Sequence, residues 1–248
     1  MLAVLSARTP AAIVEALRER GYTVLLLPPY GALASPVCDH ADMLLCALGT
    51  HLFCPLAYAE QSDARAVLDE CCRRTGLALS PLPEGEIFSS VYPNDIKLNA
   101  LLLGGHLFAR LDAVSPALCR YAETAVRLKL TDVRQGYARC STAQVAPNAI
   151  ITADRGIVDA AHSAGIEALL ISPGGIALPG YDYGFIGGAS GYDATSRTLY
   201  LCGSPALHPD WQNGRIPAFC QSHGCKVVVL PHSEWIDVGG IQFYSEKR

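Results

Sequence analysis

The chain has 248 residues, of which 50% are hydrophobic and 17% charged, and its formal net charge at pH 7 is −4. This length and apolar content suit a full hydrophobic core and argue against disorder, and the mild acidity argues against a basic nucleic-acid surface. The longest apolar run, residues 43–58, is interrupted by Gly49, His51 and Pro55 and is shorter than the roughly 20 apolar residues of a membrane helix. We therefore expect a soluble protein that contacts neither nucleic acid nor membrane.

Ten cysteines are scattered along the chain, unlike the dense pattern of a small disulfide-bonded domain. The first eight residues lack the ordered regions of a signal peptide, so we expect reduced thiols and a cytoplasmic location. Cys220, His223 and Cys225 are close in sequence, but they fall on an expected helix and the strand after it. Local packing is therefore favoured over a zinc site, and we predict no metal and no cofactor.

One sequence pattern recurs along the chain: an amphipathic helix, a glycine stop and a short β run rich in Val, Leu and Ile. Glycine ends a helix because it accepts the left-handed backbone after the last turn. The stops are Gly21, Gly76, Gly165 and Gly224, and a fifth copy, residues 124–133, lacks the glycine.

Each predicted helix has a start signal, either a small polar capping residue or a proline in the first turn. In chain order these signals are Thr9-Pro10, Ser62-Asp63, Ser115-Pro116, Asp154 and His208-Pro209-Asp210.

A segment that predicts a β-hairpin lies between each β run and the next helix. The complete copies are residues 40–55, 93–110, 140–154 and 181–202, and the last segment, 235–244, holds a single strand. Glycine, proline and small polar residues in the middle of each complete copy favour a tight reversal.

The unit repeats about every 50 residues, a period typical of circular or stacked arrays. A strand at residues 2–6 can complete the last unit, which would close a ring and leave no open sheet edge. The alternative is a βαβ sheet with helices on both faces. We favour the ring and predict one α/β domain over residues 1–248, a five-bladed α/β propeller of ββαβ quasi-repeats.

A ring of five ββαβ units resembles the pentein, or guanidine-modifying, superfamily, which includes dimethylarginine dimethylaminohydrolase, arginine deiminase and the amidinotransferases. Asn94-Asp95-Ile96 and residues 108–111 stand where the hydrolases carry Gly-Gly-Asp and Ser-x-Arg-Thr pieces, which implies ligand-binding roles for Asp95 and Arg110. Asp42 lies where the first unit offers a substrate-binding carboxylate. Residues 140–150 are similar to the segment after the catalytic histidine of dimethylargininases, and the place of that histidine falls near Gln135.

The C-terminal segment departs from this resemblance. The family nucleophile is a cysteine just after a Gly-rich turn, but here residues 237–245 contain no cysteine, and none follows Cys225. The family reaction needs a thiolate that attacks the guanidinium carbon, and neither Phe243 nor Tyr244 can supply one. We therefore expect the usual Cys-dependent reaction to be absent.

Polar residues on the predicted channel strands are the main ligand-binding candidates, because alternate side chains of such strands point into the channel. Asp95, Lys97 and Asn99 share one phase of this alternation and can grip a zwitterionic amino acid. An Asp95–Lys97 ion pair on a solvated face is the alternative. Asp182 is a further pocket carboxylate.

Two groups are candidates for catalysis. Cys140 lies beside Arg139, whose charge can lower a thiol pKa, although a buried inert cysteine is the simpler interpretation. His232 and Asp237 can form a base and its orienting carboxylate, although a surface turn is the favoured interpretation.

Carboxylates outnumber cations among the expected channel residues, which favours a cationic or amino-acid-like small ligand. The channel set is Asp42, Asp95, Lys97, Asn99, Asp182 and Asp237. Two alternatives stay open: a hydrolase or amidinotransferase-type enzyme with a relocated catalytic group, and a macromolecular binding ring like the ribosome anti-association factors of this fold. The acidic balance counts against direct RNA contact for the last of these.

Overall fold

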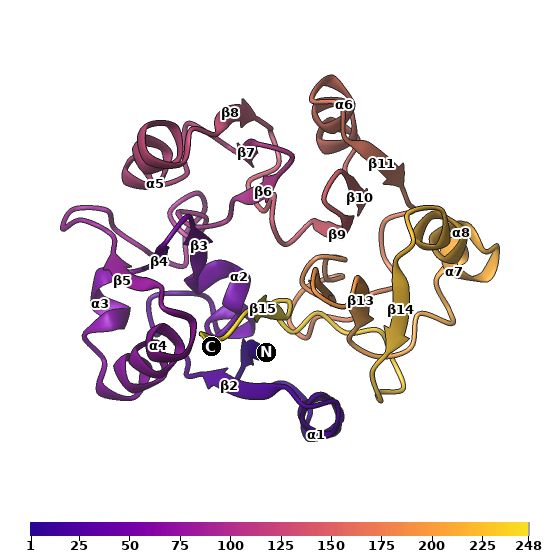
Figure 1. Ribbon diagram of the computed structural model, residues 1–248, viewed down its shortest axis with the longest axis horizontal. Helices are drawn as coiled ribbons and strands as arrows, with labels where there is room; N and C mark the ends of the chain where they lie inside the picture. Colours follow the sequence, from indigo (N-terminus) through magenta and orange to yellow (C-terminus); the bar gives the residue numbers. More distant parts are fainter. Residues whose placement is uncertain (248) are drawn as a thin grey trace.

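The computed structural model describes residues 1–247 and consists of five three-stranded sheets arranged in a ring (Figure 1). The strands are β1 (Leu2–Ser6), β2 (Thr23–Leu27), β3 (Cys46–Leu48), β4 (His51–Cys54), β5 (Ala78–Pro81), β6 (Leu101–Leu103), β7 (His106–Ala109), β8 (Lys129–Asp132), β9 (Thr142–Ala146), β10 (Ala149–Thr152), β11 (Glu167–Leu170), β12 (Ser190–Asp193), β13 (Thr198–Leu201), β14 (Lys226–Val229) and β15 (Gln242–Tyr244).

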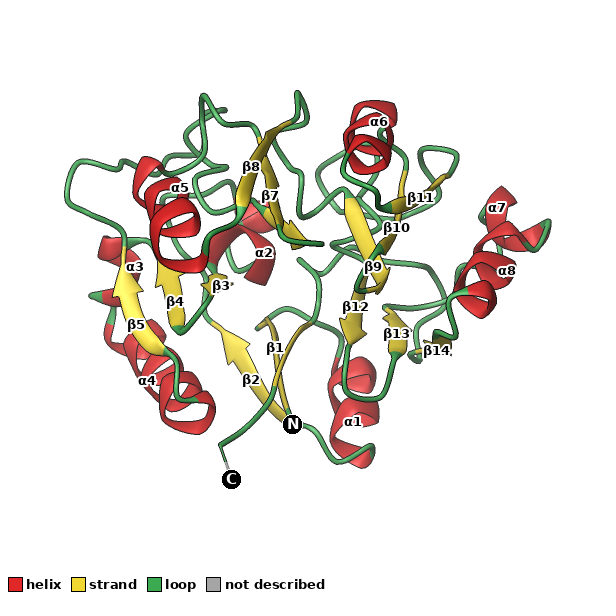
Figure 2. Cartoon of the chain, turned by 45° about the horizontal axis from the view of Figure 1, so that its top comes forward, coloured by secondary structure: helices red, strands yellow, loops and turns green. Residues whose placement is uncertain are grey.

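Helices connect the second and third strands of each sheet and lie mostly at the rim of the molecule (Figure 2). They are α1 (Ala11–Glu19), α2 (Ala41–Leu44), α3 (Leu56–Ala59), α4 (Ser62–Thr75), α5 (Pro116–Tyr121), α6 (Arg155–Ser163), α7 (Pro209–Gln212) and α8 (Arg215–Ser222), with a 3-10 turn η1 (Ser35–Val37) and a π-helical turn η2 (Ala122–Val126). Short α2 is the exception, since it lies near the middle of the ring (Figure 1). No helix within residues 1–247 has the length and apolar character to cross a membrane.

Each sheet has the same construction. An inner strand pairs antiparallel with the middle strand, through a hairpin in four of the five sheets. The middle strand pairs parallel with the outer strand after the helix, as in β3-β4-β5 and β12-β13-β14. The middle strands β10 and β13 are buried along their whole length, so the core lies around them and under the rim helices. The antiparallel pairs β3-β4, β6-β7, β9-β10 and β12-β13 confirm the four predicted hairpins.

The two ends of the chain close the ring. β15 pairs antiparallel with β1, with Leu2 opposite Tyr244 and Val4 opposite Gln242, and β1 pairs parallel with β2. The N-terminal amine also lies 2.7 Å from the Glu246 carboxylate. The predicted five-unit ring, closed by the first strand, is confirmed, and this closure brings residues 237–244 beside segments from the start of the chain.

The helix ends follow the predicted chemistry in most copies. The Ser115 and Asp154 side chains cap α5 and α6 by accepting hydrogen bonds from the third residue of each helix. In the copy without a glycine, Arg127 itself takes the left-handed conformation, with φ of 61°. The predicted cap by Thr9 is wrong, because Pro10 occupies the cap position of α1. The predicted start signal Ser62-Asp63 falls inside the first turn of α4, because Gln61 occupies its cap position.

One predicted strand segment is wrong in a way that matters for the site. Residues 94–99 form turns before β6 instead of part of the strand. Strand alternation therefore does not apply to Asp95, Lys97 and Asn99, and their side chains go to three different neighbours.

Candidate functional site

Five loops meet at one mouth of the ring, because each inner strand begins there. They comprise α2 before β3, the turns before β6, residues 137–141 before β9, residues 181–189 before β12 and residues 237–241 before β15. These segments are distant in sequence, yet the backbone N–H of Asp42 donates to the Gly239 carbonyl at 3.1 Å. The mouth therefore collects side chains from all five blades.

Asp42 is the most isolated carboxylate at this mouth. It is 1% exposed, and neither of its side-chain oxygens has a hydrogen-bond partner among residues 1–247. Burial raises the pKa of Asp42, although the neighbouring Cys140 thiol and the Arg139 charge oppose this shift. A buried carboxylate without a partner costs free energy, so Asp42 has unused capacity to accept hydrogen bonds from a cation.

Asp237 lies beside Asp42 and is held in place by backbone groups. Its two oxygens accept hydrogen bonds from the N–H groups of Phe185 at 2.8 Å and Gly239 at 2.9 Å. Gly188 makes room for this carboxylate, because a Cβ at that position would overlap it. Burial, reinforced by the charge of Asp42, raises the pKa of Asp237 to about 6, against an opposing effect of His40.

His40 is a site residue that the sequence analysis missed. Its Nδ1 lies 3.7 Å from Asp237 Oδ1, and its side chain is nearly fully buried. Burial lowers the pKa of His40, in opposition to the neighbouring carboxylates, so the ring is neutral near pH 7. No sequence signal distinguished it, because it stands far from Asp237 in the chain and meets it only through ring closure.

Cys140 and Asn99 form the floor between these carboxylates. Asn99 Nδ2 donates to Cys140 Sγ at 2.8 Å, and Asn99 Oδ1 accepts from the Arg139 N–H at 2.8 Å. Met43 Sδ lies 3.8 Å from the thiol. Burial and the charges of Asp42 and Asp237 raise the pKa of Cys140 well above the ordinary value, so the thiol stays protonated and is a poor nucleophile.

Iodoacetamide should therefore label Cys140 slowly. We expect native protein at neutral pH to react first at Cys72 and Cys119, which are only partly buried, and at Cys140 much later. Peptide mass spectrometry over a time course measures the order, with urea-unfolded protein as the control for intrinsic reactivity. Preferential labelling of Cys140 in the folded chain would contradict a protonated, inert thiol.

A cavity of about 240 Å³ opens above this floor, and we call it the carboxylate cavity. Its lining residues are Val37, His40, Met43, Tyr137, Cys140, Leu178, Tyr181, Asp182, Tyr183, Phe185 and Asp237. The Tyr137 ring lies 5.9 Å from Phe185, which lies 6.3 Å from Tyr183. A continuous aromatic wall thus faces a mouth that holds carboxylates, an arrangement suited to an organic cation.

Asp95 and Arg110, two of the three residues selected by resemblance, contact tyrosines of this wall or tyrosines packed against it. Asp95 Oδ2 accepts a hydrogen bond from the Tyr137 hydroxyl at 2.6 Å. The Arg110 guanidinium donates to the Tyr92 hydroxyl at 2.6 Å and lies 5.4 Å from the centre of that ring, and Tyr92 packs 5.8 Å from Tyr137. Neither residue lines the carboxylate cavity.

The remaining candidates are dispersed. Lys97 donates to the Ala113 carbonyl at 3.1 Å, and it forms no ion pair with Asp95 among residues 1–247. Asp182 lines the outer part of the cavity and is exposed. His232 bonds the backbone of Glu234, so the histidine in contact with Asp237 is His40 instead.

The fold and site can now be compared with known proteins. A structure of dimethylarginine dimethylaminohydrolase bound to 4-chloro-2-hydroxymethylpyridine is similar over 92% of this chain and 91% of that chain, with a TM-score of 0.57 and 10% identity. A mutant of the Pseudomonas aeruginosa enzyme complexed with citrulline gives 0.54 and 11%, covering 92% and 90%. Inosamine-phosphate amidinotransferase from Streptomyces griseus gives 0.54 and 13%, covering 93% and 76%. No curated protein matches the sequence.

These likenesses, together with the five three-stranded sheets, define the chain as a protein of pentein fold. Residues 4–242 match the model of one protein family, and the chain belongs to it: Family of unknown function (DUF6873). At 10–13% identity the solved structures show the fold alone, so the chemistry has to be argued from the site.

Proposed function

We propose that this protein binds a small organic cation, of the guanidinium or amine type, in the carboxylate cavity, without the Cys-dependent reaction of the guanidine-modifying enzymes. One observation carries the proposal: Asp42 and Asp237 are adjacent buried carboxylates, and no Lys or Arg within residues 1–247 lies within 4.0 Å of either. Two such carboxylates repel each other and favour a bound cation.

The neighbouring carboxylates of Asp39 and Asp95, unlike those of Asp42 and Asp237, have side-chain partners that are cations or hydrogen-bond donors. Asp39 also lies near the mouth, but it is neutralised by the Arg8 guanidinium and bonded to the Ser6 hydroxyl. Asp95 is engaged by Tyr137. Asp42 and Asp237 are therefore the pair with unused negative charge. Asp237 lines the carboxylate cavity, and buried Asp42 lies behind the lining, near enough to act on Asp237 through its charge.

The shape of the cavity defines the rest of the ligand. Apolar side chains of Val37, Met43 and Leu178 line it together with the aromatic wall, so an aliphatic chain attached to the cation fits better than a bare ion. A negative group on the ligand would meet Asp182 and Asp237. We therefore expect agmatine, which has no carboxylate, to bind more tightly than arginine.

Two features support the absence of the family reaction. Residues 237–245, where the resemblance implies the family nucleophile, contain no cysteine, and the Phe243 ring in this segment packs against Tyr22 and Tyr200. The remaining thiol at the mouth, Cys140, is held protonated. The ten cysteines are free, which fits action in the reducing cytoplasm.

Isothermal titration calorimetry with agmatine, arginine and citrulline tests this function. We expect binding of agmatine, weaker binding of arginine and no binding of citrulline, whose urea group is uncharged. Agmatine should also raise Tm, because a ligand of the folded state stabilises it. Absence of heat and of a Tm shift with both cations, or equal affinity for citrulline, would contradict the proposal.

A further inference from the structure

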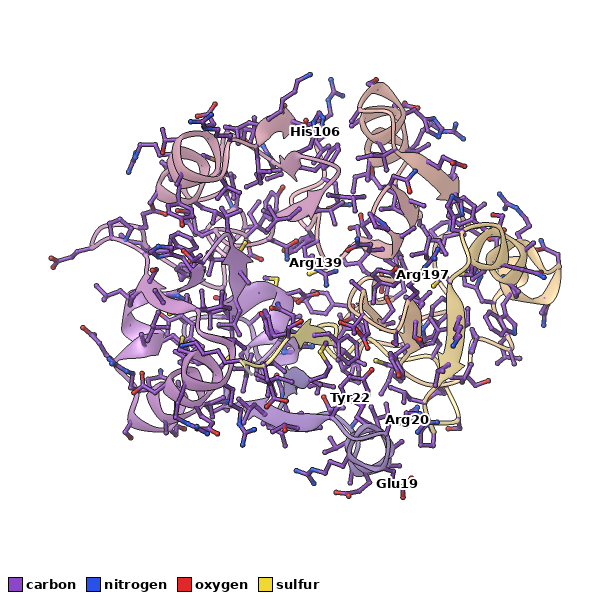
Figure 3. The ribbon with its side chains drawn as sticks, in the orientation of Figure 1. Glu19, Arg20, Tyr22, His106, Arg139 and Arg197 are labelled. Carbon is purple, nitrogen blue, oxygen red and sulfur yellow. The ribbon has the colours of Figure 1, made fainter. Side chains whose placement is uncertain are left out.

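A second cavity, of about 230 Å³, lies among the inner strands of the ring, and we call it the central cavity. Residues of all five inner strands, β3, β6, β9, β12 and β15, line it, whereas the carboxylate cavity is lined by the loops before those strands. The Cys140–Asn99 floor lies where these loops meet the strands. Figure 3 shows Arg139 in the middle of the ring, and this side chain lines the central cavity.

Arg139 is a cation without a matching anion. The residue is half-buried, and its guanidinium forms no ion pair within 4.0 Å among residues 1–247. Its single side-chain hydrogen bond in that range runs from Nη1 to the Thr142 carbonyl, at a long 3.4 Å. A guanidinium has five donors, so most of them are free to bind a ligand.

The cavity around Arg139 has polar walls. Its polar lining residues are Gln144, Ser190, Tyr192, Gln242 and Tyr244, and no Asp or Glu within residues 1–247 lines it. Gln242 is fixed by donating to the carbonyls of Ala41 at 2.7 Å and Leu45 at 3.3 Å, and Tyr244 donates to Gln242. The walls are thus held rigid around one free cationic group.

We propose that the central cavity is a separate binding site for a small oxyanion, a carboxylate or phosphate group, held by Arg139. Arginine suits this role because its planar fork bonds two oxygens of such a group at once. The site does not depend on the proposed cation site. It uses different side chains, because the two cavities share no lining residue.

The proposed anion site and the proposed cation site interact electrostatically. Arg139 lowers the pKa of Asp42, and this carboxylate therefore partly offsets the guanidinium without pairing with it. Removing the negative charge at residue 42 should strengthen anion binding, whereas it should remove cation binding. This opposite response separates the two proposals experimentally.

Titration with inorganic phosphate and with acetate, at constant ionic strength, tests the anion site. We expect native protein to bind at least one of them, R139Q to lose at least tenfold in affinity, and R139K to lose less, because lysine keeps the charge but not the fork. D42N should bind the anion as well as or better than native protein. Phosphate and acetate arms distinguish the two sources of oxyanion.

Chemical protection of the native chain provides a second readout if R139Q does not fold. Phenylglyoxal modifies free guanidinium groups, and peptide mass mapping reports each arginine. Phosphate or acetate should slow modification of Arg139 and leave that of exposed Arg155 unchanged. Anion binding by R139Q equal to that of native protein would overturn the anion site. Native protein that shows neither anion binding nor protection of Arg139 would overturn it as well. Agmatine binding by the same R139Q sample would show that the cation site exists independently of the anion site.

Discussion

Replacing Asp42 by asparagine should weaken agmatine binding at least about 30-fold, since removing one partner of a buried charge pair typically costs about 2–5 kcal/mol. Asp42 is buried, and its two oxygens form no ion pair and accept no hydrogen bond within the geometric limits among residues 1–247, so D42N removes chiefly the negative charge. Calorimetry of D42N against native protein, under the same buffer, measures the change.

Stability should move in the opposite direction in D42N. The pKa of Asp42 is raised in the folded chain, so ionisation of this group costs folding free energy once the pH exceeds its unfolded value. Asparagine does not ionise, and D42N should therefore be at least as stable as native protein at pH 7. This advantage in the free energy of unfolding should shrink as the pH falls toward 4, because Asp42 of the native protein then becomes protonated. Urea unfolding at several pH values measures this trend.

D182N is the matched control, because it removes the same charge from an exposed position that lines the carboxylate cavity. Solvent screens an exposed carboxylate, so we expect a change in affinity of less than about threefold. Equal losses in D42N and D182N would show that the site responds to overall charge alone. Full retention of binding in D42N would place the cation elsewhere.

Agmatine affinity should fall at least about tenfold between pH 7 and pH 5, since a proton competes with the cation once the pH passes below the pKa of the carboxylate. Asp237 has a pKa of about 6 in the folded chain, raised first by burial and further by Asp42. The pKa of Asp42 is raised as well, which steepens the loss. Agmatine itself stays fully protonated over this range, so the change reports the protein.

The D237N variant separates this effect from general acid sensitivity. It should bind more weakly at pH 7 and show a smaller change between pH 7 and pH 5, because one of the two titrating groups is gone. Circular dichroism at each pH verifies that the chain stays folded. An affinity that is constant over this range in native protein, or that rises on acidification, would be incompatible with ionised Asp237 in the site.

Most of the fold could be predicted from the sequence because each blade repeats the same local chemistry. Hairpin turns, capping residues such as Ser115 and Asp154, and helix-stop glycines act over a few residues. Ring closure by the first strand followed from an unpaired strand at each end of the chain. Thr9 failed as a cap because Pro10 took that position.

The site was less predictable because it depends on loop geometry. Strand alternation placed Asp95, Lys97 and Asn99 on one face, but turns carry them, and only Asn99 reaches the floor. Asp42 and Asp237 were both selected from the sequence, yet their adjacency and their contact with His40 arise from packing between the two ends of the chain. Pairwise sequence signals do not contain that information.

The electron density of crystals grown with agmatine tests the central claim most directly. We predict that the guanidinium or the amine lies between the carboxylates of Asp42 and Asp237, above the Cys140 thiol, with the aliphatic chain along Tyr137 and Phe185. A carboxylate cavity filled by water alone at a saturating agmatine concentration, with the cation bound at another surface, would contradict it.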